Sequence, residues 1–299
     1  MLENQQIFRQ RSPLGEMQSQ IYLRWEPVTN IMKISDKGNG NHKYNRLLEE
    51  MNAQQVRKNI NRKSIAILIF GACENHGDHM PFGSDFIFPM ELAKRIVAKS
   101  EKKENTIILP AIPYGVSLHH NEYQMTMSLE PHTLQMVIED LFSSIIKNGI
   151  RRILIINGHD GNIAPIELAA RTTKSRHAEV VIACLEAWWD LVGEITRGLF
   201  AVWRGLGHGG EAETSAMLAV RPDLVNMKLA PNEVIPALPS DRIRIYWRFN
   251  ELTRTGATGA PKKATIQKGK QVLRALEDTL LSFINDMDRT EWRYGLLLK

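Results

Sequence analysis

Cysteine is scarce in this sequence: the 299 residues contain only two, Cys73 and Cys184, which lie far apart. This spacing argues against both a disulfide framework and a thiolate zinc site, so any metal ion must be held by histidine and carboxylate side chains. Long apolar runs are also missing. The best candidate, residues 65–73, is interrupted by Gly71 and is much shorter than the roughly 18 residues that cross a bilayer.

A secretory signal is missing as well, because the first thirty residues intersperse charges with no continuous apolar block. We therefore expect a soluble, cytoplasmic protein with no membrane partner. The net charge is +5, and residues 1–63 account for the whole excess, with 11 Lys and Arg against 6 Asp and Glu. Because these charges are interspersed, a solvated arm is favoured over a nucleic-acid contact. We predict a basic, poorly ordered extension over residues 1–45.

The rest of the chain, residues 46–299, alternates short apolar runs with longer amphipathic segments and is expected to form one domain. Buried strands are expected at 64–70, 106–111, 152–157 and 179–185. The clearest helices are expected at 86–99, 133–147, 163–176, 211–220 and 268–286. Such repeats predict an α/β fold, a three-layer α/β/α sandwich with a mostly parallel central sheet. Ligands in such sheets bind beyond the carboxyl ends of the strands.

Polar motifs follow two of the predicted strands. The first, GACENHGDHMPFGSD over residues 71–85, contains Glu74, His76 and Asp85, and the second, NGHDGN, contains His159. Imidazole and carboxylate ligands together suit zinc, manganese or iron, and a carboxylate can bridge two ions. We therefore expect these four side chains to bind metal, with Asp85 as the bridge.

A third motif, GHGGEAETS over residues 207–215, contains His208, Glu211 and Glu213. The two glutamates cannot share one helix face, but they can reach different sides of one cavity. Each motif also has an ordinary interpretation, as a polar turn, a hydrogen-bonded histidine or an acidic helix start. Three such clusters at the ends of elements of one sheet favour a metal site, because buried charges are costly without a cation.

Taken together, the motifs resemble those of the creatininase family, an E-x-H-G-x-H-x-P-x-G-x-D loop, an N-G-H-x-x-N turn and an H-x-G-E-x-E-T segment. All three occur here in order, within residues 51–250. The resemblance implies an amidohydrolase with two divalent metal ions per subunit, zinc, iron or manganese. It places Glu74 and His159 on one ion, His76 on the other, and Asp85 between them.

The sequence departs from the pattern of creatininase proper at Gly161. The resemblance implies that creatininase proper has a glutamate metal ligand at this position. Glu211 is the expected replacement as a metal ligand, as the resemblance to the wider family implies. His208 and Glu213 then remain as the catalytic residues, with His208 as a proton donor oriented by Glu213. The departure disfavours creatinine itself as the substrate.

The activity that the resemblance implies is hydrolysis of a carbon–nitrogen bond other than a peptide bond, in a linear formamide or a cyclic amide. A formamidopyrimidine-nucleotide deformylase-like activity is favoured. Creatinine amidohydrolase proper and a two-metal phosphoesterase are the enzymatic alternatives. The non-enzymatic alternative is a nucleic-acid-binding protein with a structural metal. The resemblance also implies a homo-oligomer such as a hexamer.

Several residues beside the motifs are candidates for contact with a small-molecule amide substrate. His119, His120 and Tyr123 lie in a loop that resembles the G-x-S-x-x-H loop of the family, and an ordinary surface loop is the alternative. Trp188 and Trp203 flank the third motif and could stack on a planar heterocycle, although core packing is the alternative for both.

Overall fold

A computed structural model describes residues 46–101, 105–200, 207–232 and 245–298. The predicted extension over residues 1–45 and Trp203 lie outside these residues. Within the described ranges, none of the helices has the length and apolar character needed to span a membrane.

The centre of the fold is a parallel sheet. Its strands are β1 (Ile65–Phe70), β2 (Thr106–Ile108), β3 (Arg152–Asn157) and β4 (Val181–Leu185). They are arranged in the order β2-β1-β3-β4, and all three neighbouring pairs are parallel. β1 and β3 lie in the middle and pair along their whole length, from Ile65 opposite Arg152 to Phe70 opposite Asn157. Every residue of β1 is buried, as expected for a strand that is covered on both faces.

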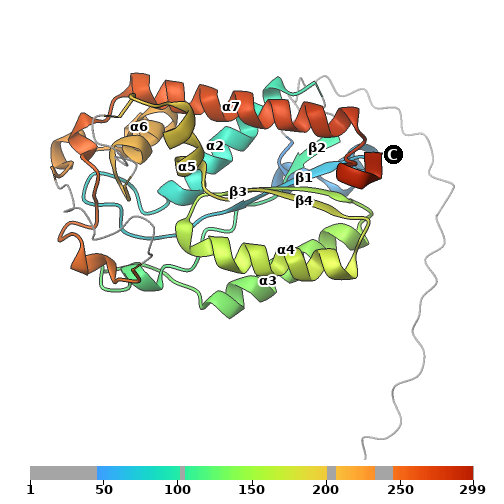
Figure 1. Ribbon diagram of the computed structural model, residues 1–299, viewed down its shortest axis with the longest axis horizontal. Helices are drawn as coiled ribbons and strands as arrows, with labels where there is room; N and C mark the ends of the chain where they lie inside the picture. Colours follow the sequence, from blue (N-terminus) through green and yellow to red (C-terminus); the bar gives the residue numbers. More distant parts are fainter. Residues whose placement is uncertain (1–45, 102–104, 201–206, 233–244, 299) are drawn as a thin grey trace, which may run out of the picture. The chain divides into compact units, whose positions relative to one another are not determined.

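Helices cover both faces of this sheet. The covering helices are α2 (Ser84–Lys99), α3 (Pro131–Lys147), α4 (Ile163–Arg176), α5 (Trp188–Ile195), α6 (Glu211–Val220) and α7 (Ile266–Arg289). A further short helix, α1 (Ala53–Asn59), precedes β1 and has no buried residues. Figure 1 shows α2, α5, α6 and α7 on one side of the sheet and α3 and α4 on the other. The predicted three-layer sandwich with a parallel central sheet is therefore confirmed.

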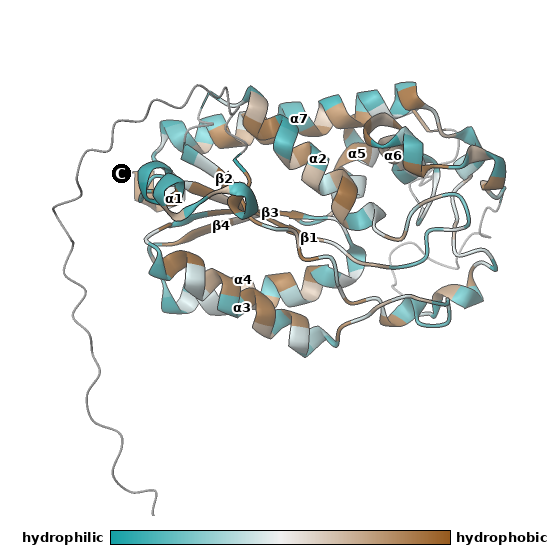
Figure 2. Cartoon of the chain, turned by 180° about the vertical axis from the view of Figure 1, so that it is seen from behind, coloured by the Kyte–Doolittle hydropathy of each residue, from teal (hydrophilic) through white to brown (hydrophobic). Residues whose placement is uncertain are grey.

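Two hydrophobic clusters hold the layers together, and alternate residues of β1 contribute to each. Ile67 and Ile69 belong to the cluster beneath α2 and α7, whereas Leu68 and Phe70 belong to the cluster with α3. Figure 2 shows the strands as a largely brown, hydrophobic layer between helices whose colours alternate. This alternation follows from the pleat of a strand, which directs successive side chains to opposite faces.

The sheet differs from the prediction mainly at β2, which ends at Ile108 although a strand was expected as far as residue 111. Pro110 has no N–H group to donate and interrupts the ladder. Leu109 N still donates to Ile67 O at 2.9 Å, and pairing resumes where Ile112 N donates to Ile69 O at 2.9 Å. Helices α1 and α5 were not among the clearest helices of the sequence, because both are short.

We predict that Phe142→Ala, in α3, lowers the free energy of unfolding by about 3–5 kcal/mol, because the fully buried ring leaves a cavity against the sheet. Met136→Ala in the same helix is the control. Met136 is 53% exposed, so its truncation should cost less than about 0.5 kcal/mol. Urea titration followed by circular dichroism measures both values, and equal losses in the two variants would contradict the proposed core.

Candidate metal centre

The three polar motifs meet at the carboxyl ends of β1 and β3. The loop after β1 carries Glu74 and His76, both fully buried, and Asp85 lies in the first turn of α2. Its carboxylate is favoured there by the partial positive charge of the helix N-terminus. The turn after β3 carries His159, which is 4% exposed.

A proline and a glycine allow these segments to approach closely. Pro89 lies inside α2 and lacks an N–H group, so the carbonyl group of Asp85 receives no helical hydrogen bond from it. A Cβ atom on Gly158 would lie 1.8 Å from that carbonyl oxygen. Only glycine therefore allows the turn after β3 to pack on the start of α2, and this contact places His159 beside Asp85.

The first group of possible ligands consists of Glu74, Asp85 and His159. His159 Nδ1 lies 3.2 Å from Glu74 Oε1 and 3.2 Å from Asp85 Oδ2. Both carboxylate oxygens of Glu74, and Oδ2 of Asp85, are buried without a hydrogen-bond partner in the described part of the chain. Such oxygens are costly to bury unless positive charge compensates them. A divalent cation fits this donor set.

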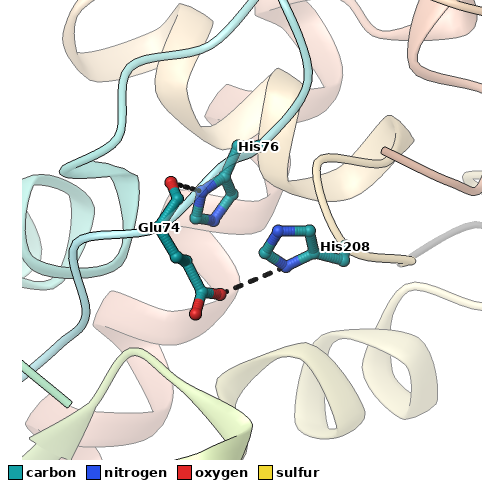
Figure 3. A group of neighbouring side chains, drawn as sticks. All are labelled: Glu74, His76 and His208. Carbon is teal, nitrogen blue, oxygen red and sulfur yellow. Dashed lines mark hydrogen bonds and ion pairs between the residues drawn. The ribbon is translucent and has the colours of Figure 1, made fainter. Parts of the chain in front are cut away.

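A second group consists of His76, Asp85 and Glu213, from the third motif at the start of α6. His76 Nε2 lies 2.9 Å from Asp85 Oδ1 and 4.0 Å from Glu213 Oε2. Asp85 thus presents one carboxylate oxygen to each group. A third group joins Glu74 and His76 to His208 (Figure 3), with His208 Nδ1 3.5 Å from Glu74 Oε1.

Each of the three imidazoles is anchored through one nitrogen to a backbone carbonyl. His76 Nδ1 lies 3.0 Å from Glu74 O, His159 Nε2 lies 2.8 Å from Val116 O, and His208 Nε2 lies 2.6 Å from Asn75 O. A carbonyl oxygen can only accept a hydrogen bond, so each of these nitrogens carries a hydrogen. The other nitrogen of each ring faces the carboxylates, which is the arrangement typical of metal-binding histidines.

The electrostatics of the centre also suit a cation. Burial lowers the pKa of His76, but the neighbouring carboxylate of Asp85 outweighs it and raises that pKa to about 10. Burial also lowers the pKa of His159, but Glu74 and Asp85 outweigh it and raise that pKa well above its ordinary value. Burial raises the pKa of Glu213 to about 8. Binding of a cation at these groups would therefore displace protons from them.

The two glutamates of α6 are placed differently from the sequence-based expectation. Glu211, predicted as a metal ligand, is fully buried on another side of α6 and forms an ion pair with Lys268 of α7. Glu213, predicted as a catalytic residue, joins the second ligand group, and its Oε2 accepts a hydrogen bond from Gly209 N at 2.7 Å. Residues two apart on a helix point in different directions, so only one of them can face the centre.

His208 and Glu213 are both at the centre, but in the described residues no hydrogen bond joins them. His208 is oriented by the carbonyl group of Asn75 instead of by Glu213. The turn after β3 offers no carboxylate at Gly161. A Cβ atom at Gly161 would lie 1.9 Å from Val116 O, so the turn after β3 has no room for a side chain there.

The side chains predicted to contact substrate fall into two groups, one beside the metal centre and one in the hydrophobic core. The His119 ring is stacked on that of His159, with 5.8 Å between ring centroids, and the Tyr123 hydroxyl donates to Thr253 O at 2.6 Å. Trp188, in contrast, is 3% exposed and packs on Phe88 in the hydrophobic core. It reaches the centre only as part of the wall of a small pocket that Asp85 and Glu213 also line.

Two aromatic residues at the centre were not identified from the sequence. Trp247 lies with its ring centroid 5.9 Å from that of His119, and the centroid of Phe249 lies 4.2 Å from that of His120. They belong to a segment far along the chain from the first two motifs, with no metal-ligand pattern of its own. His120 is 1% exposed, and its Nε2 lies 3.7 Å from Glu74 Oε1.

A buried group of imidazoles and carboxylates at the carboxyl edge of a parallel sheet is typical of metal-dependent hydrolases. The family model for creatininase, described as creatinine amidohydrolase, matches residues 49–284, and the chain belongs to this family of hydrolases.

Two relatives in sequence have different activities. Creatinine amidohydrolase from Pseudomonas putida is 27% identical over 233 residues, which cover 70% of this chain and 84% of the relative. The mycofactocin precursor peptide peptidase of Mycobacterium tuberculosis is 25% identical over 224 residues, 71% of this chain and 81% of the relative. Membership of the creatininase family is therefore established for this chain, but the names of the two relatives indicate different substrates.

Solved structures agree with the fold. A crystal structure of creatininase, 24% identical, has a TM-score of 0.70 and covers 81% of this chain and 98% of that one. A manganese form of creatininase, 23% identical, has a TM-score of 0.70 with 80% and 97% coverage. A zinc–zinc form of a mutant creatininase, 25% identical, has a TM-score of 0.68 with 81% and 97% coverage.

We predict that the metal-free protein releases protons when it binds a divalent cation at pH 7. Without metal, neighbouring carboxylates raise the pKa of His76 to about 10 against the effect of burial, and burial raises the pKa of Glu213 to about 8. The pKa of His159 is also raised well above its ordinary value. Metal ligands must be deprotonated, so on the order of two or more protons should leave. Calorimetric titration with zinc in two buffers of different ionisation enthalpy measures the number. Glu277→Gln, at a carboxylate paired with Arg95, is the control and should leave it unchanged. Heats that do not depend on the buffer would contradict the prediction.

Proposed function

We propose that this chain is a binuclear metal-dependent amidohydrolase. Glu74, Asp85 and His159 would hold one divalent cation, and His76, Asp85 and Glu213 would hold the other. The observation that carries the proposal is the position of Asp85, whose Oδ1 lies 2.9 Å from His76 and whose Oδ2 lies 3.2 Å from His159. A carboxylate between two imidazoles in this way is suited to bridging two ions.

Two bound cations would act as Lewis acids and lower the pKa of a water molecule to about 7. His208 is the residue best placed to move the proton. Burial and the neighbouring imidazoles of His76 and His120 hold the pKa of His208 well below its ordinary value. The ring is therefore neutral at pH 7 and can accept a proton from the attacking water. Returning that proton to the departing nitrogen completes hydrolysis of the carbon–nitrogen bond.

A linear formamide or a cyclic amide is the substrate class that we favour, as in formamidopyrimidine-nucleotide deformylases. Creatinine itself is disfavoured, because the position at Gly161 offers no carboxylate and no room for one. A peptide bond is the second candidate, and it is supported by the similarity to the mycofactocin precursor peptide peptidase. Zinc and manganese are the metals to test first, because solved creatininases contain them, and iron is the third candidate. A homo-oligomer such as a hexamer stays a prediction.

A substrate screen tests this function. Protein loaded with zinc, manganese or iron would be incubated with a formamidopyrimidine nucleotide, creatinine, a short peptide and a generic phosphodiester, and products followed by mass spectrometry. We expect turnover of an amide that is lost on chelation and restored by metal. Hydrolysis of the phosphodiester alone would favour the phosphoesterase instead. Metal-independent turnover, or no amide turnover with any metal, would overturn the proposal.

The two glutamates of α6 provide a matched pair of variants. Glu213→Gln should lose one of the two ions and lower turnover by on the order of 10²-fold or more, because a metal ligand and the charge balance of the centre are removed. Glu211→Gln should keep both ions and near-normal turnover, while losing about 1–3 kcal/mol of stability as its pair with Lys268 weakens. Elemental analysis, turnover and denaturant unfolding distinguish the two. Loss of metal from Glu211→Gln alone would reverse the assignment.

A further inference from the structure

Phe249 is an aromatic residue at the centre with no place in the chemistry described so far. It begins a single turn of 3-10 helix, Phe249–Glu251, and is 3% exposed. Its ring centroid lies 4.2 Å from that of His120 and 4.9 Å from that of His208. One side chain therefore contacts two of the imidazoles that face Glu74.

Of these two imidazoles, His120 is held less firmly than the other rings of the centre. His208 has the hydrogen bond from its Nε2 to Asn75 O. For His120, Nδ1 has no hydrogen-bond partner in the described residues, and the 3.7 Å between its Nε2 and Glu74 Oε1 is too long for a hydrogen bond. The final torsion of a histidine has only broad energy minima. The orientation of the His120 ring must therefore come from the side chains packed around it.

The backbone around Phe249 is well placed to provide that packing. Thr253 N donates to Phe249 O at 3.2 Å, and Thr253 O accepts from the hydroxyl of Tyr123, in the loop that carries His120. A few residues further on, Thr258 N donates to His208 O at 2.8 Å. The segment 249–258 is thus hydrogen-bonded both to the loop of His120 and to the turn of His208.

We propose that Phe249 is a positioning residue that fixes the rings of His120 and His208 relative to Glu74. The two rings lie 4.3 Å apart at an angle of 44°, and Phe249 packs nearly parallel to His120, at 30°, and edge-on to His208, at 74°. A rigid aromatic ring of this size restricts both imidazoles at once, whereas a flexible aliphatic side chain would leave them free to rotate. The effect on turnover rests on the proposed function, but the effect on the two rings does not.

The test compares Phe249→Leu, which removes the ring, with Phe249→Tyr, which keeps it. Phe142→Leu is the matched control, because it removes the same ring from the core beneath α3, away from the centre. The first readout is hydrogen–deuterium exchange at the C2 carbon of each histidine, measured by mass spectrometry on the metal-loaded protein. Phe249→Leu should raise the exchange rate of His120 and His208 several-fold and leave that of the exposed His132 unchanged. Phe249→Tyr and Phe142→Leu should match the wild type.

The second readout is steady-state kinetics with whichever amide the wild type hydrolyses. Phe249→Leu should lower kcat by on the order of 10²-fold, because a misplaced group costs this much, while KM changes by less than about threefold and metal content is unaltered. Phe249→Met, whose longer unbranched side chain can adapt to the space left by the ring, gives the same comparison if Phe249→Leu does not fold.

Unchanged exchange at His120 and His208 in the leucine variant would overturn the proposal, as would an equal change in Phe142→Leu. If the wild type hydrolyses no amide, the proposed function fails while the exchange measurement still decides the role of Phe249.

Discussion

The structure depends on the burial of two carboxylates, Glu74 and Asp85, among imidazoles at the edge of the sheet. Three of their four oxygens have no hydrogen-bond partner in the described chain. Buried charge of this kind is unfavourable unless positive charge lies close to it. Protonated imidazoles can provide that charge in the metal-free protein, and divalent cations can provide it in the form that we propose to be active. The same arrangement therefore links the stability of the centre to its chemistry.

The parallel sheet brings together segments that are distant in sequence. β1 and β3 are neighbours and end at the same edge, so the loop with Glu74 and His76 meets the turn with His159. α6 adds Glu213 from much later in the chain, and it packs against α2, which carries Asp85. Anchoring His76, His159 and His208 to backbone carbonyls then fixes which nitrogen faces the carboxylates, so the fold determines the orientation of these donors as well as their positions.

Much of this could be predicted from the sequence, because the strand-forming runs and the motifs that follow them are local patterns. The positions of Glu74, His76 and His159 after strand ends needed only the rule that parallel strands end together. Which of Glu211 and Glu213 faces the centre depends on the rotation of α6 about its axis, and in the structure Glu211 pairs instead with Lys268 of α7, a helix much later in the sequence. Trp188 was ambiguous because core and pocket favour the same residue type, and Phe249 has no motif around it.

The carbonyl group of Val116 has a consequence for any attempt to redesign this enzyme. It accepts a hydrogen bond from His159 and also fills the space where a side chain at Gly161 would begin. A residue with a side chain therefore cannot be introduced at position 161 by a single substitution. The loop around Val116 would have to move first, and His159 would lose its anchor in the process. Placing a carboxylate at position 161 thus requires coordinated changes in two loops, the one that carries Val116 and the turn that carries His159.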